Sequence, residues 1–399
     1  MTPADGKTVL LLNARIVLPD RIAEGANLLI EDGRISGILD SPSNQSVKAE
    51  SVIDLDGLTL FPGFIDAHIH GAVGVDTMTA SADGLCRVAE FLARNGVTAW
   101  LPTLVPAASA EYGNAIAAID DAMRDQKEMQ TGSLRSRPLG VHYEGPFVNS
   151  EQCGALHREH FRTFKDAADL DTLPRMKTDG AVHMMTLAPE IDGGVELVAE
   201  LSRRGWIVSI GHTRATVDVL DEALQAGGRH LTHFMNAMPP LHHRAPGPVG
   251  WGLLRDDVTC DIIADGVHLD PLTLRLIIRS KTADRVSLIS DAIAAAGLED
   301  GEYQIWGETI SVENGRTKNA RGSIAGSVIT MLDAVRMMRS LGASEVEVAR
   351  MAAANPARLL SIDHDCGSIE EGKRADLVAL DRDATVRLTM IGGALNRSS

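Results

Sequence analysis

Residues 62–71 of the chain read Pro-Gly-Phe-Ile-Asp-Ala-His-Ile-His-Gly. A short apolar stretch that runs into two histidines and a glycine predicts a β-strand over residues 63–67 with a polar end. Side chains two positions apart on a strand point to the same face, so His68 and His70 can both reach one metal ion. A His-x-His pair also occurs by chance in cores and on surfaces, but its place between a strand and a glycine favours the metal interpretation.

Seven further strand patterns follow this one, and helical stretches separate most of them. The expected strands span residues 97–104, 139–144, 183–188, 206–211, 230–233, 259–264 and 285–290. Apolar residues within 85–92 show the i, i+3, i+4, i+7 spacing of an amphipathic helix, and residues 215–226 and 271–281 have a similar pattern. Strands that alternate with helices in this way predict a TIM-type (β/α)8 barrel.

Both ends of the chain predict short β-strands instead of strand–helix units. Asp32-Gly33 lies between two apolar runs, which is a strong signal of a β-hairpin. The expected strands lie within residues 9–18, 27–39, 52–60, 375–380 and 386–391. We therefore expect residues 1–61 and 361–399 to form one small β-sandwich domain, and residues 62–360 to form the barrel.

Composition and charge are those of an ordinary globular chain of acidic character. The 399 residues are 44% hydrophobic and 23% charged, with a formal net charge of −16. This charge argues against binding to nucleic acid or to an anionic membrane, although a few local cations can still bind a phosphorylated substrate. The cysteines have no paired spacing, no stretch of about 20 apolar residues could span a bilayer, and no signal peptide is expected. The sequence thus predicts a cytoplasmic location.

Polar residues that can bind a metal recur where the predicted strands end, which is where a TIM-type barrel gathers its catalytic residues. They are His68, His70, Glu144, His212, His233, His268 and Asp291. Any one of the histidines alone is more simply explained as a core residue, and Glu144 alone could be a loop carboxylate in a salt bridge. Their recurrence at six strand ends favours a metal site, because ligation offsets the cost of burying an unpaired carboxylate.

Several strings of residues resemble those of a known family. His68-x-His70, His212, His233 and Asp291 are similar to the amidohydrolase superfamily, whose barrels hold one or two divalent metals. The chain more closely resembles the N-acetylglucosamine-6-phosphate deacetylase family in the strings PGFIDAHIHG, GVHYEGPF, TLAPE, GHTRAT, THFMNAM, ADGVH, SDA, AGSVITM and NPARLL. The resemblance covers nearly the whole chain, and the Glu-Gly-Pro and His-x-x-Asn-Ala-Met strings are its most specific parts.

The resemblance implies a set of metal ligands. Glu144, His212 and His233 would bind the principal ion, and Glu144 takes the place of the carboxylated lysine that bridges two metals in many amidohydrolases. His68 and His70 are retained, so we expect one or two divalent ions. Mixed nitrogen and oxygen ligands suit zinc, which we expect first, or iron.

The reaction implied is hydrolysis of the acetamide of N-acetyl-D-glucosamine 6-phosphate to D-glucosamine 6-phosphate and acetate. A bound metal can lower the pKa of water to about 7, and Asp291 would pass the proton of the attacking water to the leaving amine. His157 is the expected counterpart of the family histidine that holds the substrate carbonyl. Residues 154–157 read Gly-Ala-Leu-His, one residue longer than the Gly-Ala-His or Gly-Thr-His of the family.

The resemblance also implies residues that bind the sugar phosphate. These are Asn236, Ala237, Arg244 and His268. The family arginine that matches Arg244 reaches into the site of the neighbouring subunit, which implies a homodimer.

Three alternatives stay open from the residues alone. The nearest keeps the chemistry and changes the substrate to N-acetylgalactosamine 6-phosphate or an unphosphorylated acetamido sugar. A cyclic-amide hydrolase or deaminase is disfavoured by Glu144 and by the lack of a recognised bridging lysine. A non-catalytic amidohydrolase-like protein is disfavoured because such proteins typically lose metal ligands, which are present here.

Overall fold

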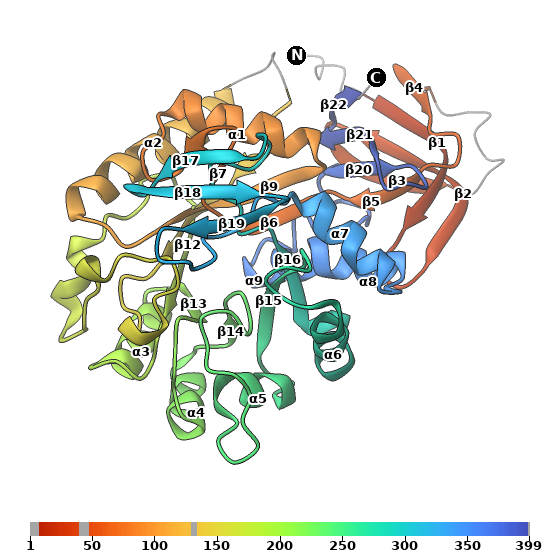
Figure 1. Ribbon diagram of the computed structural model, residues 1–399. Coiled ribbons are helices and arrows are strands. Elements are labelled where there is room, and N and C mark those ends of the chain that lie inside the picture. Colours follow the sequence, from red (N-terminus) through yellow and green to blue (C-terminus); the bar gives the residue numbers. More distant parts are fainter. Residues whose placement is uncertain (1–7, 40–47, 129–133, 398–399) are drawn as a thin grey trace.

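The computed structural model describes residues 8–39, 48–128 and 134–397, which form a barrel and a separate sheet (Figure 1). Residues 1–7, on which the expected absence of a signal peptide partly rests, lie outside these ranges. None of the described helices is long and apolar enough to cross a membrane.

The barrel contains all the parallel strands that were expected from the sequence. They are β6 (Phe64–Ile69), β9 (Val97–Leu104), β11 (Gly140–Glu144), β12 (Val182–Leu187), β13 (Ile207–Ile210), β14 (His230–Leu231), β15 (Thr259–Ile263) and β16 (Val286–Ile289), each beside the next in this order. A short strand, β10 (Arg137–Pro138), also pairs with β9. The amide of Asp291 donates to the carbonyl of His68 at 2.9 Å, so the last strand meets the first and nearly closes the ring. The prediction of a TIM-type barrel is confirmed.

Helices surround these strands and bury their apolar faces. They are α1 (Ala82–Arg94), α2 (Ser109–Glu128), α3 (Gly194–Arg203), α4 (Val217–Ala226), α5 (Gly247–Leu254), α6 (Pro271–Lys281), α7 (Met331–Ser340), α8 (Glu345–Ala349) and α9 (Asn355–Leu359). In α1, Leu85, Val88 and Leu92 are buried, as their spacing predicts, and the side chain of Ser81 caps the first turn. Covered on the outside by helices and filled on the inside, the strand β9 is buried at every position, as is typical of parallel sheets.

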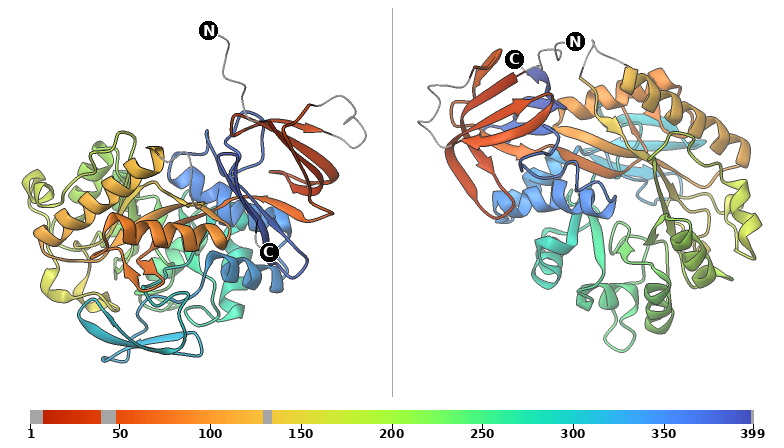
Figure 2. Two further views of the ribbon diagram at one scale, coloured as in Figure 1. Left: turned by 90° about the horizontal axis from the view of Figure 1, so that it is seen from above. Right: turned by 180° about the vertical axis from the view of Figure 1, so that it is seen from behind.

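The two chain ends meet in a second sheet beside the barrel, as predicted (Figure 2). It comprises β1 (Thr8–Val17), β2 (Ile22–Glu31), β3 (Arg34–Leu39), β4 (Ser51–Asp54), β5 (Thr59–Pro62), β20 (Leu377–Leu380), β21 (Val386–Ile391) and β22 (Ala394–Arg397). Apolar side chains from both ends, such as Leu28 and Met390, belong to one buried cluster. Arg137 forms an ion pair with Asp376 at 2.9 Å and so joins the barrel to this sheet. The domain boundaries at residues 61 and 361 stay predictions.

A small three-stranded sheet, which was not predicted, lies between β16 and α7 in the sequence and is called the third sheet below. Its antiparallel strands are β17 (Gly301–Ile305), β18 (Glu308–Glu313) and β19 (Arg316–Asn319). Asn314 and Gly315 connect the last two with φ values of 51° and 72°, so the sequence does contain the Asn-Gly hairpin signal. The other turn, Trp306-Gly307, belongs to the mouth of the barrel and is described below.

One buried amide fixes the start of β16, the strand that leads to Asp291. Asn355 is 5% exposed, and its Nδ2 donates to the carbonyls of Ala283 and Val286 at 2.6 Å. Alanine would remove both bonds, and each buried acceptor left unpaired costs about 1–3 kcal/mol. We expect Asn355→Ala to lower the melting temperature by about 2 °C or more, measured by calorimetry. Asn114→Ala, at an exposed position of α2, is the control, and equal melting temperatures for the two variants would contradict this role.

Candidate active site

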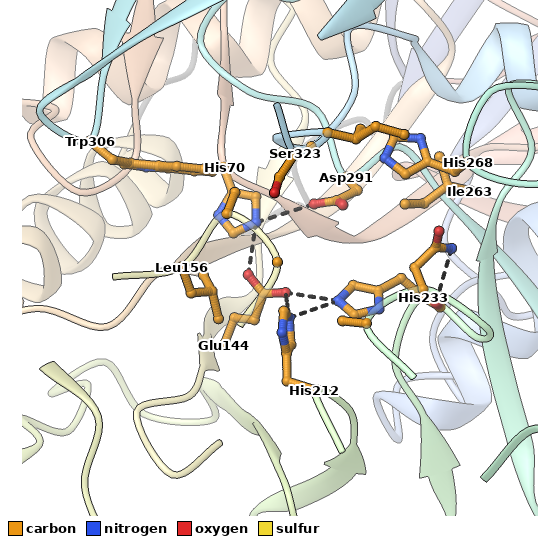
Figure 3. Close-up of a pocket in the computed structure, with 16 residues that line it drawn as sticks. His70, Glu144, Leu156, His212, His233, Ile263, His268, Asp291, Trp306 and Ser323 are labelled. Carbon is orange, nitrogen blue, oxygen red and sulfur yellow. Dashed lines mark hydrogen bonds and ion pairs between the residues drawn. The ribbon is translucent and has the colours of Figure 1, made fainter. Parts of the chain in front are cut away.

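Four histidines and two carboxylates converge at the C-terminal ends of the barrel strands, and Figure 3 shows all of them except His68. They come from β6 (His68) and the position just after it (His70), from the end of β11 (Glu144), and from just beyond β13, β14 and β16 (His212, His233, Asp291). All are buried, with exposed fractions between 0% and 7%. The structure thus brings together the metal-binding and proton-transfer residues that the sequence indicated.

The backbone turns sharply where three of these residues leave their strands. His212, His233 and Asp291 have positive φ values of 48°, 29° and 49°. Such a conformation is uncommon for residues other than glycine and costs of order 1–3 kcal/mol, and it clusters at functional sites. In Figure 3 the side chains of His212 and His233 point toward Glu144, and that of Asp291 points toward His70.

One group of donor atoms consists of Glu144, His212 and His233. The Glu144 Oε1 atom is 2.9 Å from Nε2 of His212 and 3.0 Å from Nε2 of His233, and these two nitrogens are 3.1 Å apart. Ligands of a tetrahedral zinc ion at about 2.0–2.1 Å lie roughly 3.3 Å from one another. The spacing and chemistry of this group therefore fit one divalent cation.

A second group shares Glu144 and adds the His68–His70 pair. The two Nε2 atoms are 3.2 Å apart, and Oε2 of Glu144 is 3.2 Å from Nε2 of His70. The Asp291 Oδ1 atom lies 3.2 Å from Nε2 of His70 and 3.4 Å from Nε2 of His68. Both groups qualify as possible metal sites in the described chain, and a carboxylate common to both is suited to holding two ions side by side.

Two residues outside the cluster, Gln152 and Asp261, hydrogen-bond to candidate ligands. Nδ1 of His212 donates to the carbonyl of Gln152 at 2.7 Å, so its Nε2 is the nitrogen that faces Glu144. The Asp261 carboxylate accepts the backbone N–H of His233 and lies 3.0 Å from Nε2 of His230. The bond from His212 to Gln152 is of the kind that sets the tautomer and direction of a metal-binding histidine.

The electrostatics of the cluster keep its carboxylates ionised. Burial acts to raise the pKa of Glu144, but the charge of His68 and hydrogen bonds from nearby imidazoles outweigh it, and the pKa lies well below its usual value. Burial also acts to raise the pKa of Asp291, but the charge of His68 and the hydrogen bond to His70 outweigh it, so this pKa is lowered as well. Burial acts to lower the pKa of His70, but hydrogen bonds to the carboxylates raise it to about 10. Bound cations would therefore displace protons from the ligands.

The cluster, apart from His68, forms the floor of a pocket of about 330 Å³. Asn236, Ala237 and His268, three residues implied to bind the sugar phosphate, also line it. Nδ1 of His268 is 2.7 Å from Oδ2 of Asp265, which leaves its Nε2 available to a ligand. The pocket therefore combines possible metal ligands with polar groups suited to a sugar.

Arg244 does not line the pocket of its own chain. It lies on the exposed segment between β14 and α5, and its Nη1 is 2.8 Å from Nε2 of His243. Its role toward a substrate phosphate, and the homodimer that this role implies, stay predictions.

His157 is placed outside the pocket, and the residue before it is placed inside. Leu156 lines the pocket, whereas His157 has Nδ1 at 3.2 Å from Glu159 and Nε2 at 3.7 Å from Glu308. The backbone of His157 is extended, and neighbouring side chains of an extended segment point to opposite sides. The structure thus does not bring His157 to the metal ligands, and its catalytic role stays a prediction.

Eight residues that line the pocket were missed from the sequence. They are Gly154, Ala155, Leu156, Ile263, Trp306, Ser323, Ile324 and Gly326. Trp306 and the last three belong to the third sheet and the segment after it, so their position depends on how that sheet packs. The only local signal was the glycine after Trp306, which indicates a turn.

The family and the relatives of the chain agree with this geometry. The model of the Amidohydrolase family matches residues 59–395. The N-acetylglucosamine-6-phosphate deacetylase of Bacillus subtilis (strain 168) is 34% identical over 97% of this chain and 96% of that protein. The N-acetylgalactosamine-6-phosphate deacetylase of Escherichia coli O157:H7 is 35% identical over 97% of this chain and 99% of that protein.

Solved structures are similar over the same length. The crystal structure of N-acetylglucosamine-6-phosphate deacetylase from Pasteurella multocida has a TM-score of 0.88 and 30% identity, covering 98% of this chain and 100% of that one. A mutant of the Mycobacterium smegmatis deacetylase in complex with N-acetyl-D-glucosamine-6-phosphate has a TM-score of 0.86 and 30% identity, covering 98% and 99%. The chain therefore belongs to the amidohydrolase family and, within it, to the N-acetylglucosamine-6-phosphate deacetylases.

Proposed function

We propose that the protein hydrolyses the acetamide of N-acetyl-D-glucosamine 6-phosphate to D-glucosamine 6-phosphate and acetate. The observation that carries this proposal is the position of Asp291 beside two donor groups that share Glu144, on the floor of a pocket with polar groups on one side. The names of the Bacillus subtilis and Pasteurella multocida relatives support it. A related deacetylase was also solved with this sugar phosphate.

The metal ligands in this proposal are the five residues of the two donor groups. Glu144, His212 and His233 would hold one divalent cation, and His68 and His70 with Glu144 would hold a second, with zinc preferred over iron. Such a cation, when bound, polarises the acetyl carbonyl and lowers the pKa of water.

Asp291 is the proton carrier in this mechanism. Its carboxylate stays ionised because its pKa is lowered beside His68 and His70, so it can accept the proton of the attacking water. The same group then returns that proton to the nitrogen as the C–N bond breaks. Proton transfer in both directions requires Asp291 to reach both the attacking water and the leaving amine from the floor of the pocket.

The polar side of the pocket would bind the sugar. His268, fixed by Asp265, faces the same space as Asn236 and Ala237, and these groups can donate to hydroxyl or phosphate oxygens. In a homodimer, Arg244 of the second copy would pair with the negative charge of the phosphate. We also propose a cytoplasmic location, which the free, buried state of all four cysteines supports.

A second candidate substrate is N-acetylgalactosamine 6-phosphate, because the relative with that name is as similar as the glucosamine relatives. The deciding experiment measures acetate release by the zinc-loaded protein. N-acetylglucosamine 6-phosphate, its galacto epimer and unphosphorylated N-acetylglucosamine are compared. A preference for the first supports the proposal, a preference for the second selects the alternative, and no turnover of any of them contradicts both.

Counting the bound metal ions in variants tests the two donor groups separately. We expect two zinc equivalents per chain, measured by plasma mass spectrometry. The double variant His68→Ala/His70→Ala should keep one, and Glu144→Ala should lose both, because Glu144 belongs to both groups. His183→Ala, a histidine outside the pocket, is the control. A wild-type protein that binds a single equivalent would contradict the second site.

Replacing the proton carrier should separate metal binding from turnover. Asp291→Asn keeps the shape of the side chain and removes its basicity, so we expect kcat to fall by at least about 10²-fold with unchanged metal content. Asp284→Asn, an exposed position paired with Arg350, is the control. Full activity of Asp291→Asn would refute the proposed role.

The trans role of Arg244 can be tested by mixing subunits. Arg244→Ala and Asp291→Asn each remove one part of a shared site, and a mixed dimer regains one complete site. Because random reassembly gives mixed dimers in half of the molecules, about one quarter of wild-type activity should return. A mixture as inactive as the separate variants would show that Arg244 does not act across the dimer.

A further inference from the structure

One side of the pocket is apolar, and no residue on it takes part in the mechanism above. Ala155, Leu156 and Trp306 contribute to this side. Figure 3 shows Leu156 and Trp306 on one side of the ligand cluster, with His268 on the other. Leu156 is 3% exposed, so it is a fixed part of the wall.

The backbone at Trp306 has a strained conformation that positions the indole side chain. Ile305 pairs with Glu308, which leaves Trp306 and Gly307 as a two-residue turn with φ values of 53° and 75°. Turns of this type favour asparagine or glycine at both positions, and a left-handed conformation is unfavourable for other residues. The strain places an indole in the pocket, where its ring packs edge-to-face on His70 with centroids 5.1 Å apart.

The loop and the hairpin that form the wall are connected to each other. Nη2 of Arg321 donates to the carbonyl of Ala155 at 2.8 Å and lies 3.4 Å from Glu308. Ala155 and Trp306 also pack against the same apolar cluster beneath the third sheet. The apolar side is therefore a built surface, with His157 beside Glu308 on its outer side.

The chemistry of the two sides determines how a substrate can lie. A hydroxyl or phosphate placed against Leu156 and the ring carbons of Trp306 would lose hydration without gaining a hydrogen-bond partner, which is unfavourable. The methyl end of an acetamide has no such cost, and its carbonyl then reaches the floor of the pocket. We propose that Leu156 and Trp306 form the acyl-binding wall and limit the length of the N-acyl group that is removed. This inference rests on the proposed deacetylation.

The test compares acyl groups of increasing length on one sugar phosphate. The probes are N-acetyl-, N-propionyl- and N-butyryl-glucosamine 6-phosphate, with kcat/KM and metal content measured for each protein. For the wild type we expect the butyryl compound to react at least about 10-fold less efficiently than the acetyl compound. In Trp306→Ala and Leu156→Ala this ratio should shrink by about 5-fold or more, because the space for extra methylenes opens.

A control separates a wider wall from a loosened hairpin. Val312→Ala changes a buried residue of β18 in the apolar cluster, away from the pocket, and should leave the ratio unchanged. If Trp306→Ala loses metal through its contact with His70, Leu156→Ala decides the question. An unchanged ratio in Leu156→Ala, or an equal change in Val312→Ala, overturns the acyl wall. Absence of acetate release by the wild type overturns the proposed function instead.

Discussion

The carboxylate of Glu144 is buried among four imidazole rings, with its oxygens 2.9–3.6 Å from their Nε2 atoms. An isolated carboxylate at 4% exposure would be strongly destabilising. The surrounding histidines offset this cost, and they can do so only if the barrel brings the ends of β6, β11, β13 and β14 to one place. The burial of Glu144 and the formation of the barrel therefore depend on each other.

The order of the strands in the barrel could be predicted because a short stretch of sequence is enough to indicate each strand. Most strands are short apolar runs, as in Phe64–Ile69, and the polar residues His70, Glu144, His212, His233 and Asp291 at or just beyond strand ends line the pocket. Glu144, His212, His233 and Asp291 were predicted for the same reason, since parallel strands bring their carboxyl ends to one side. Family resemblance added the chemistry, which spacing alone does not determine.

The walls of the pocket could not be predicted in the same way. Whether Leu156 or His157 faces inward depends on the alternation of one extended segment, and a single added residue exchanges the two. Trp306 reaches the pocket through a turn whose direction depends on the packing of Ala155 and Ile305 in one apolar cluster. Such tertiary packing has no periodicity that the sequence reveals.

The last strand meets the first through the bond from the amide of Asp291 to the carbonyl of His68. During synthesis on the ribosome, His68 and Glu144 emerge long before β16 is made. The five proposed metal ligands are complete at His233, whereas Asp291, the proposed proton carrier, follows the eighth strand. A nascent fragment that lacks β16 would therefore carry every proposed metal ligand but not the proton carrier, and the site becomes complete only when the ring closes.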